Sequence, residues 1–154
     1  MASNPPGRLP LKGQMRQYQS KAPAETPDTE LARLERGVSV LAEIGPFRPS
    51  VELAKAISEQ LLRVPGMYAG WADQLYRAAV SVPANIAEAH GRNSLAQRIQ
   101  YTAIGRGSAW EVLALLLSAP VGQDVEALVD QARDVAVGLD RLVLEMTRER
   151  AGGG

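Results

Sequence analysis

The chain has 154 residues, and its 17 Lys and Arg balance its 17 Asp and Glu, so the formal net charge is zero. It holds one His and no Cys, which excludes disulfide scaffolds, thiolate nucleophiles and metal centres with several His or Cys ligands. Its length suits one domain with a sizeable core. With 45% hydrophobic but only 5% aromatic residues, the composition favours packed helices.

No segment has the features of a membrane span or of a secretory signal. The longest apolar run, residues 112–119, is interrupted at Ser118 and is far shorter than the roughly 18 residues that a span needs. Pro5, Pro6 and Pro10 stand where a signal peptide needs an apolar stretch. We therefore expect a soluble cytoplasmic protein that does not bind a membrane.

The charges are unevenly distributed along the chain. Residues 1–24 hold four basic residues and no acid, and residues 63–106 hold five arginines and two acids. Residues 111–149 hold eight acids and three arginines. The neutral total thus combines a basic tail and a basic middle with an acidic C-terminal third, so a local nucleic-acid site is compatible with it.

The first predicted elements precede the main body of the chain. Residues 1–27 are rich in Pro, Gly, Gln and Ser, and we predict a disordered basic tail. Residues 28–45 carry apolar positions three and four apart, which predicts a short amphipathic helix. Gly45 and Pro46 end that helix, and residues 47–49 are predicted to form a break.

Four longer helices are predicted to follow, at about residues 50–64, 71–90, 94–119 and 124–148. Ser50 is the predicted N-cap of the first helix, and Gly91 the predicted end of the second. Ser94 and Gln97 form a capping box for the third. Short connectors favour antiparallel neighbours, so the fold prediction is all-α: an antiparallel up-and-down four-helix bundle over residues 50–148, with a flexible C-terminus at 149–154.

The second helix carries a polar stripe that core packing does not require. Arg77, Ser81, Asn85, Glu88 and Arg92 repeat at spacings of four, four, three and four. They lie about 100° from the predicted apolar stripe of the same helix, which consists of Leu75, Ala79, Val82, Ile86 and Ala89. A buried amide or carboxylate without partners costs several kcal/mol. We therefore predict a structural polar seam, which consists of Ser81, Asn85, Glu88, Ser108 and Glu111. A ligand-binding role for these residues is the alternative.

Glycine and proline within these helices also require a reason. Gly105 and Gly107 each cost roughly 1 kcal/mol against Ala, and we expect close helix contact to offset this cost at both. Pro83 removes the hydrogen bond to the carbonyl of Ala79 and should kink the helix. Ser81 or Asn85 is expected to satisfy that carbonyl.

Four arginines are candidates for nucleic-acid binding: Arg77, Arg92, Arg98 and Arg106. Arg98 and Arg106 are eight residues apart, close to one helix face, and Arg92 lies in the preceding turn. Such a cluster binds phosphates, or it pairs with the acidic last helix within or between subunits. Tyr101 and Trp110 are nine residues apart and are expected to pack at helix or subunit seams rather than on bases.

The sequence has no constellation that is typical of an enzyme. Glu88 and His90 are two residues apart and point to different faces, and no Glu-x-x-His pair is present for a di-iron bundle. No glycine-rich phosphate loop follows a strand, and His90 suits a cap at a helix C-terminus. We expect no catalytic residues, no cofactor, no metal site and no small-molecule substrate.

Two ordered motifs carry a family resemblance. The first is Arg77-Ala-Ala-Val-Ser-Val-Pro-Ala-Asn-Ile-Ala-Glu88 followed by Gly91-Arg92, and the second is Gly107-Ser-Ala-Trp-Glu111. The region 50–148 resembles the four helix bundle protein family. That family includes proteins encoded in intervening sequences of bacterial large-subunit ribosomal RNA genes, and the accessory variability determinant of diversity-generating retroelements.

The resemblance implies a homopentameric barrel of four-helix bundles. In the retroelement members, the barrel binds the reverse transcriptase and nucleic acid through basic surfaces. By position, Arg77 and Arg92 match basic places in the motif, and Asn85 and Glu88 match its polar centre.

Two functions are expected on this basis. The first is a non-enzymatic oligomeric adaptor, an accessory factor that binds a reverse transcriptase and RNA or DNA. The alternative is a purely structural protein–protein module without nucleic-acid binding, in which the helix at 28–45 and the tail act as docking elements.

Overall fold

The computed structural model describes residues 36–37 and 39–152. The predicted tail at 1–27 and the first part of the predicted helix at 28–45 lie outside this range; within it, residues 36–37 and 39–43 are helical. The chain divides into two units, Met1–Arg36 and Gly37–Gly154, and the features below belong to the second.

Four long helices make up most of the described chain: α2 (Phe47–Leu61), α3 (Ala69–His90), α4 (Leu95–Leu117) and α5 (Glu126–Gly152). A short 3-10 helix, η2 (Gly66–Tyr68), precedes α3. No strand occurs in the described residues, so the all-α prediction is confirmed. None of these helices is both long and apolar enough to cross a membrane.

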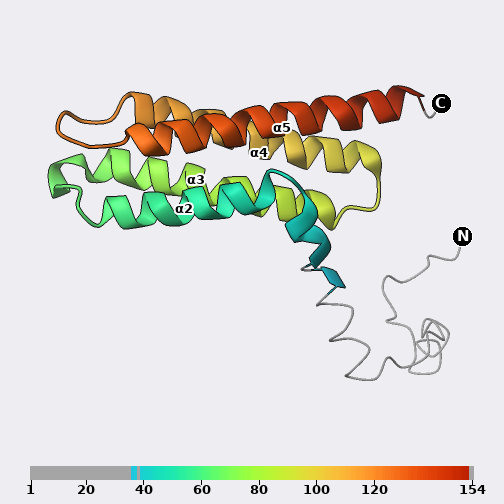
Figure 1. The fold of residues 1–154 in the computed structure, drawn as a ribbon, viewed down its shortest axis with the longest axis horizontal. Coiled ribbons are helices and arrows are strands. Elements are labelled where there is room, and N and C mark those ends of the chain that lie inside the picture. Colours follow the sequence, from blue (N-terminus) through green and yellow to red (C-terminus); the bar gives the residue numbers. More distant parts are fainter. Residues whose placement is uncertain (1–35, 38, 153–154) are drawn as a thin grey trace, which may run out of the picture. The chain divides into compact units, whose positions relative to one another are not determined.

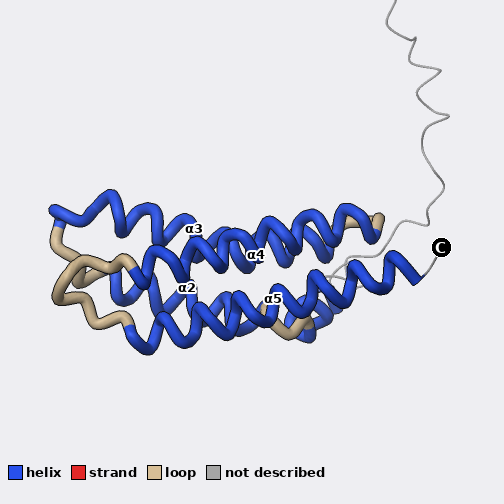
Figure 2. The backbone as a smooth tube through the Cα atoms, turned by 90° about the horizontal axis from the view of Figure 1, so that it is seen from above, coloured by secondary structure: helices blue, strands red, loops and turns tan. Residues whose placement is uncertain are grey.

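The four helices lie side by side around one core. α3 packs against α2 and α4, and α5 packs against α4 and α2, so each helix has two neighbours. Figure 1 shows the α2–α3 and α4–α5 connections at one end and the α3–α4 connection at the other. Figure 2, turned by 90°, shows α3 and α4 beside α2 and α5. Every helix therefore has one side in the core and one side facing outward.

The core consists of aliphatic side chains from all four helices. The predicted apolar stripe of α3 is fully buried: Leu75, Ala79, Val82, Ile86 and Ala89. Among its partners in the core are Leu53 and Ile57 of α2, Val112 and Leu116 of α4, and Val135 and Leu139 of α5. A buried Leu or Ile stabilises the fold by about 1.5–3 kcal/mol relative to an exposed one, so this core fixes which sides of the helices face outward.

The start of α2 differs from the prediction. The helix begins at Phe47, with Pro46 as N-cap residue and Pro49 in the first turn. Prolines are tolerated there because the first-turn N–H groups have no partner within the helix. Ser50 lies inside the helix with 1% of its surface exposed, and its hydroxyl donates to the carbonyl of Phe47 at 2.7 Å. The predictions of a break at 47–49 and of a cap at Ser50 are therefore wrong.

The ends of α3 and the start of α4 follow the prediction. The Ser94 hydroxyl accepts a hydrogen bond from the backbone N–H of Gln97 at 3.3 Å, which caps α4. Gly91 is the C-cap residue of α3, in a right-handed conformation with φ −72°. α5 continues to Gly152, so the prediction of a flexible C-terminus from residue 149 is wrong for residues 149–152, which are helical.

Candidate functional site

The polar seam between α3 and α4 holds three of the five predicted seam residues. The hydroxyl oxygens of Ser81 and Ser108 are 2.9 Å apart, which joins the two helices directly. The side-chain amide of Asn85 donates to the carbonyl of Ser81 at 2.8 Å and to its hydroxyl oxygen at 3.0 Å. The three partly buried polar groups thus satisfy one another.

Gly105 faces this seam, whereas Gly107 does not. A Cβ atom at Gly105 would lie 3.3 Å from Cβ of Asn85 and 3.4 Å from the carbonyl oxygen of Val82. The missing side chain therefore lets α3 and α4 approach closely. At Gly107, no described atom of another helix comes within 4 Å of the same position. The prediction that both glycines allow close approach is right for Gly105 and wrong for Gly107 within this chain.

The hydrogen bonds near Pro83 also differ from the prediction. α3 runs as one helix through Pro83. The Asn85 amide donates to the carbonyl of Ser81 rather than to that of Ala79, and the Ser81 hydroxyl is joined to Ser108. Ser81 therefore joins α3 to α4, and Asn85 reinforces the turn that contains Pro83, instead of either side chain capping the carbonyl that the proline releases.

Glu88 and Arg92 form a separate cluster at the end of α3. Glu88 is exposed and pairs with Arg92 one turn later. The Arg92 guanidinium lies 4.4 Å from the ring centre of Tyr101 and donates to its hydroxyl at 2.9 Å. The carboxylate, the cation and the aromatic ring tie the α3–α4 turn to α4. The structure thus places Glu88 beside the turn rather than in the seam.

Arg77 and Glu111 line a shallow polar groove on the outer side of α3 and α4. Gln74, Ser81 and Ser108 complete its polar lining. Nε of Arg77 donates to Asp73 at 3.0 Å, and this hydrogen bond, with the Coulomb attraction of the same carboxylate, raises the pKa of Arg77 above its usual value. The groove presents amide, hydroxyl, guanidinium and carboxylate groups to solvent, so it is suited to hydrogen bonding rather than to an apolar ligand.

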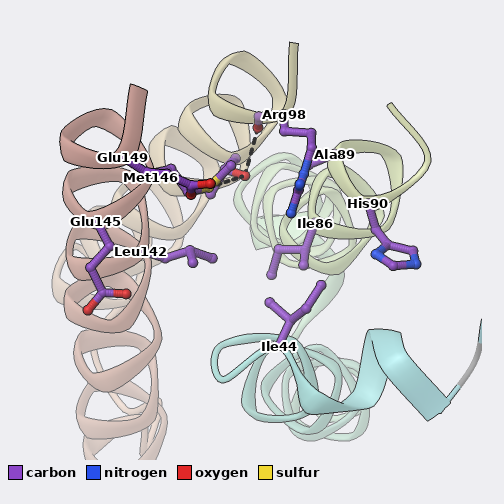
Figure 3. Close-up of a pocket in the computed structure, with 10 residues that line it drawn as sticks. Ile44, Ile86, Ala89, His90, Arg98, Leu142, Glu145, Met146 and Glu149 are labelled. Atoms are coloured by element: carbon purple, nitrogen blue, oxygen red, sulfur yellow. Dashed lines mark hydrogen bonds between the residues drawn. The ribbon is translucent and has the colours of Figure 1, made fainter. Parts of the chain in front are cut away.

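The remaining two candidate arginines contact or approach α5. Nε of Arg106 lies 3.7 Å from Oδ1 of Asp140. Arg98 lines a cavity of about 260 Å³ at one end of the bundle, which Glu145 and Glu149 of α5 also line. In Figure 3, Ile44, Ile86 and Leu142 point toward one another across this cavity. The four arginines thus face different surroundings, and three of them pair with a carboxylate of the chain.

Exposed apolar side chains are the feature that the sequence patterns did not reveal. The large ones on the four helices are Tyr76, Val80, Ile104, Trp110, Leu117, Val137 and Leu144. A signal was present: Ala103, Gly107, Trp110, Ala114 and Leu117 repeat at four, three, four and three residues. That spacing is as regular as a core stripe, and only the structure shows that this side of α4 faces outward.

The described residues contain no group of three or more His, Asp or Glu side chains placed to hold a metal ion. A family model described as 23S rRNA-intervening sequence protein matches residues 47–131, which is more than half of the chain and extends from the start of α2 into α5. No curated protein matches the chain. The match covers both motifs and the whole α3–α4 seam, and the chain belongs to the 23S rRNA-intervening sequence protein family.

Proposed function

We propose that this protein is a non-enzymatic cytoplasmic adaptor. In this proposal it is an antiparallel up-and-down four-helix bundle that assembles into a homopentameric barrel and holds a partner on its surface. The observation that carries the proposal is the apolar surface outside the core: Trp110 is 45% exposed and Leu144 49% exposed. Clusters of exposed apolar side chains are typical of protein–protein interaction sites.

The more specific form of the proposal concerns the partner. It is a reverse transcriptase with its RNA or DNA, as the resemblance to accessory proteins of diversity-generating retroelements suggests. The basic residues at positions 1–24, four with no acid among them, support contact with phosphates. In the bundle, the charges of Arg77, Arg92 and Arg106 are partly neutralised by Asp73, Glu88 and Asp140.

These ion pairs favour a second candidate, a purely structural protein–protein module without nucleic-acid binding. Phosphate contact would have to displace carboxylates that already hold the guanidinium groups, which reduces the gain from each contact. The apolar surface serves this candidate as well as it serves the first. The two candidates therefore differ only in their behaviour toward nucleic acid.

Binding of the full-length protein to labelled RNA and single-stranded DNA between 50 and 300 mM salt separates them. The adaptor with a nucleic-acid partner predicts an affinity that falls steeply with salt, with a slope of about −0.7 for each phosphate contacted on a single strand. Replacing Arg8, Lys12, Arg16 and Lys21 by Ala should weaken binding at least tenfold, whereas Arg77→Ala should change it little. Absent or salt-independent binding would contradict this function and leave the structural module.

Co-purification with a reverse transcriptase tests the partner itself. If a reverse-transcriptase gene lies beside the gene for this protein, the two proteins are co-expressed and one is tagged. The retroelement form predicts a stable complex that survives nuclease treatment, because contacts between the two proteins, rather than nucleic acid, hold it together. Failure of the pair to co-purify would contradict that form.

A further inference from the structure

An apolar face lies on the outer side of α4 and α5, and the partly exposed ion pair of Arg106 and Asp140 separates its α4 part from its α5 part. Arg106, one turn before Trp110, contacts Asp140 of α5, which places this side of α4 next to α5. Val137 and Leu144 lie three residues before and four residues after Asp140, on the same side of α5. We name this surface the α4–α5 face; its residues are Ala103, Gly107, Trp110, Ala114, Leu117, Val137 and Leu144.

Gly107 gives this face a hollow in its middle. A glycine inside a helix is unfavourable relative to Ala, and within the described chain nothing occupies the space where its side chain would lie. Trp110 lies one turn away and is 45% exposed. A bare backbone next to a large aromatic side chain forms a groove beside a ridge, and the ridge of an approaching helix can pack into such a groove.

A second apolar face lies on the outer side of α2 and α3. Tyr76 lines a groove with Ser58, Leu61 and Leu62, so it lies on the side of α3 that faces α2. Val80 and Ala87 continue this side along α3. Leu62 is 87% exposed and Tyr76 46% exposed. We name this surface the α2–α3 face; its residues are Leu62, Tyr76, Val80 and Ala87.

The two faces lie on opposite sides of the bundle. α2 and α3 contact each other, α4 and α5 contact each other, and the two pairs are joined through α3–α4 and α2–α5 contacts. Figure 1 shows α4 and α5 as one layer and α2 and α3 as the other. Two different faces on opposite sides suit head-to-tail association, since a two-fold dimer would pair one face with itself and leave the other exposed.

We infer that a second copy of this chain covers the α4–α5 face with its own α2–α3 face, so that one of its side chains reaches the backbone at Gly107. This inference rests on the oligomer in the proposed function and adds the surfaces that build it. It does not depend on nucleic-acid binding.

The apolar area of the two faces agrees with such an interface. From their exposed fractions, the large side chains of the two faces offer about 700 Å² of accessible surface; they are Leu62, Tyr76, Val80, Trp110, Leu117, Val137 and Leu144. A standard interface buries about 1,600 Å² in total, of which about 900 Å² is apolar. The two faces therefore supply most of the apolar area that one stable interface needs.

Two full-length double variants test the inference by light scattering. One carries Gly107→Leu with Trp110→Asp and disrupts only the α4–α5 face; the other carries Tyr76→Asp with Val80→Asp and disrupts only the α2–α3 face. Each alone should have the mass of one chain, 16.5 kDa. Mixed in equal amounts they should form a dimer of twice that mass, because one intact face of each kind remains in the mixture.

Ile104→Asp is the matched control, because Ile104 is as exposed as Trp110, at 46%, but lies on the α3 side of α4 and outside both faces. It should keep the wild-type mass. Circular dichroism should show unchanged helix content in all variants, which separates loss of association from unfolding.

The outcomes separate the inference from the proposal beneath it. A wild-type protein of single-chain mass overturns both the oligomer and the faces. An oligomeric wild type whose double variants keep its mass overturns the faces alone. Folded monomeric variants that form no dimer when mixed overturn the head-to-tail arrangement. A dimer formed by one variant alone also overturns it, because a two-fold interface on the intact face would give that result.

Discussion

Gly105 and Gly107 lie two residues apart on α4 and face opposite sides of the helix. Each costs roughly 1 kcal/mol relative to Ala. At Gly105, close contact with Asn85 and Val82 of α3 offsets this cost. At Gly107, nothing in the described chain offsets it. The inner side of α4 is thus complete in one copy of the protein, whereas our inference assigns the covering of its outer side to a second copy.

The largest effect is expected on the inner side. Gly105→Leu would force a side chain into a space whose nearest atoms lie 3.3 and 3.4 Å from the new Cβ. Overpacking of this kind costs typically 1–3 kcal/mol, and we expect about 3 kcal/mol because one of the two neighbours is backbone. Urea unfolding measures it. A loss below about 1 kcal/mol would show that α3 and α4 separate easily.

Asn85→Ala should have the next largest effect. It removes the two hydrogen bonds that Asn85 makes to Ser81 and leaves a partly buried carbonyl without its extra donor. We expect a loss of about 1.5 kcal/mol in the free energy of unfolding. The Ser81→Ala and Ser108→Ala double variant removes both hydroxyls of one pair and should cost less. If the double variant costs more than Asn85→Ala, the Ser81–Ser108 contact dominates the seam.

Gly107→Ala should act in opposite directions on folding and on association. In the monomeric Tyr76→Asp, Val80→Asp background, it should stabilise the fold by about 1 kcal/mol, because helix propensity improves and the space is open. In the otherwise wild-type chain, it should weaken the oligomer, because the hollow is filled. Thermal unfolding measures the first effect, and dilution followed by mass photometry the second. If Gly107→Ala raises both the stability of the fold and the stability of the oligomer, the role of the hollow is contradicted.

The smallest effect is expected where the α3–α4 turn meets solvent. Arg92→Lys keeps the positive charge but loses the planar contact with Tyr101 and the hydrogen bond to its hydroxyl. We expect a loss of about 0.5 kcal/mol. Tyr101→Leu should lower the effect of Arg92→Lys toward zero in a double-mutant cycle. If Arg92→Lys costs the same free energy of unfolding with and without Tyr101→Leu, Glu88 alone holds Arg92.

The inner side of the bundle is the part that the sequence predicts well. The stripe from Leu75 to Ala89 is buried as its spacing requires, since a helix of this length can hide only one side. The partners of Ser81 and Asn85 follow from the need to satisfy partly buried polar groups.

Other features depend on surroundings that spacing does not encode. Glu88 and Glu111 have the same helical spacing as the seam residues. A small rotation about the helix axis from one turn to the next is enough to move a position from the buried side to solvent. The start of α2 was missed because a proline in the first turn resembles a break in the sequence. The outer stripe around Trp110 has the spacing of a core stripe, and only the placement of the helices shows that it faces outward.

One measurement tests most directly whether the inner side of α4 is complete in one copy while the outer side needs a second copy. It is the mass of the unmodified full-length protein in solution, obtained by light scattering over a hundredfold range of concentration. We predict a single species with an integral multiple of 16.5 kDa, five chains in the proposed barrel, that persists on dilution. A mass of 16.5 kDa throughout would contradict it, because the exposed faces and the open glycine would then have no second copy to cover them.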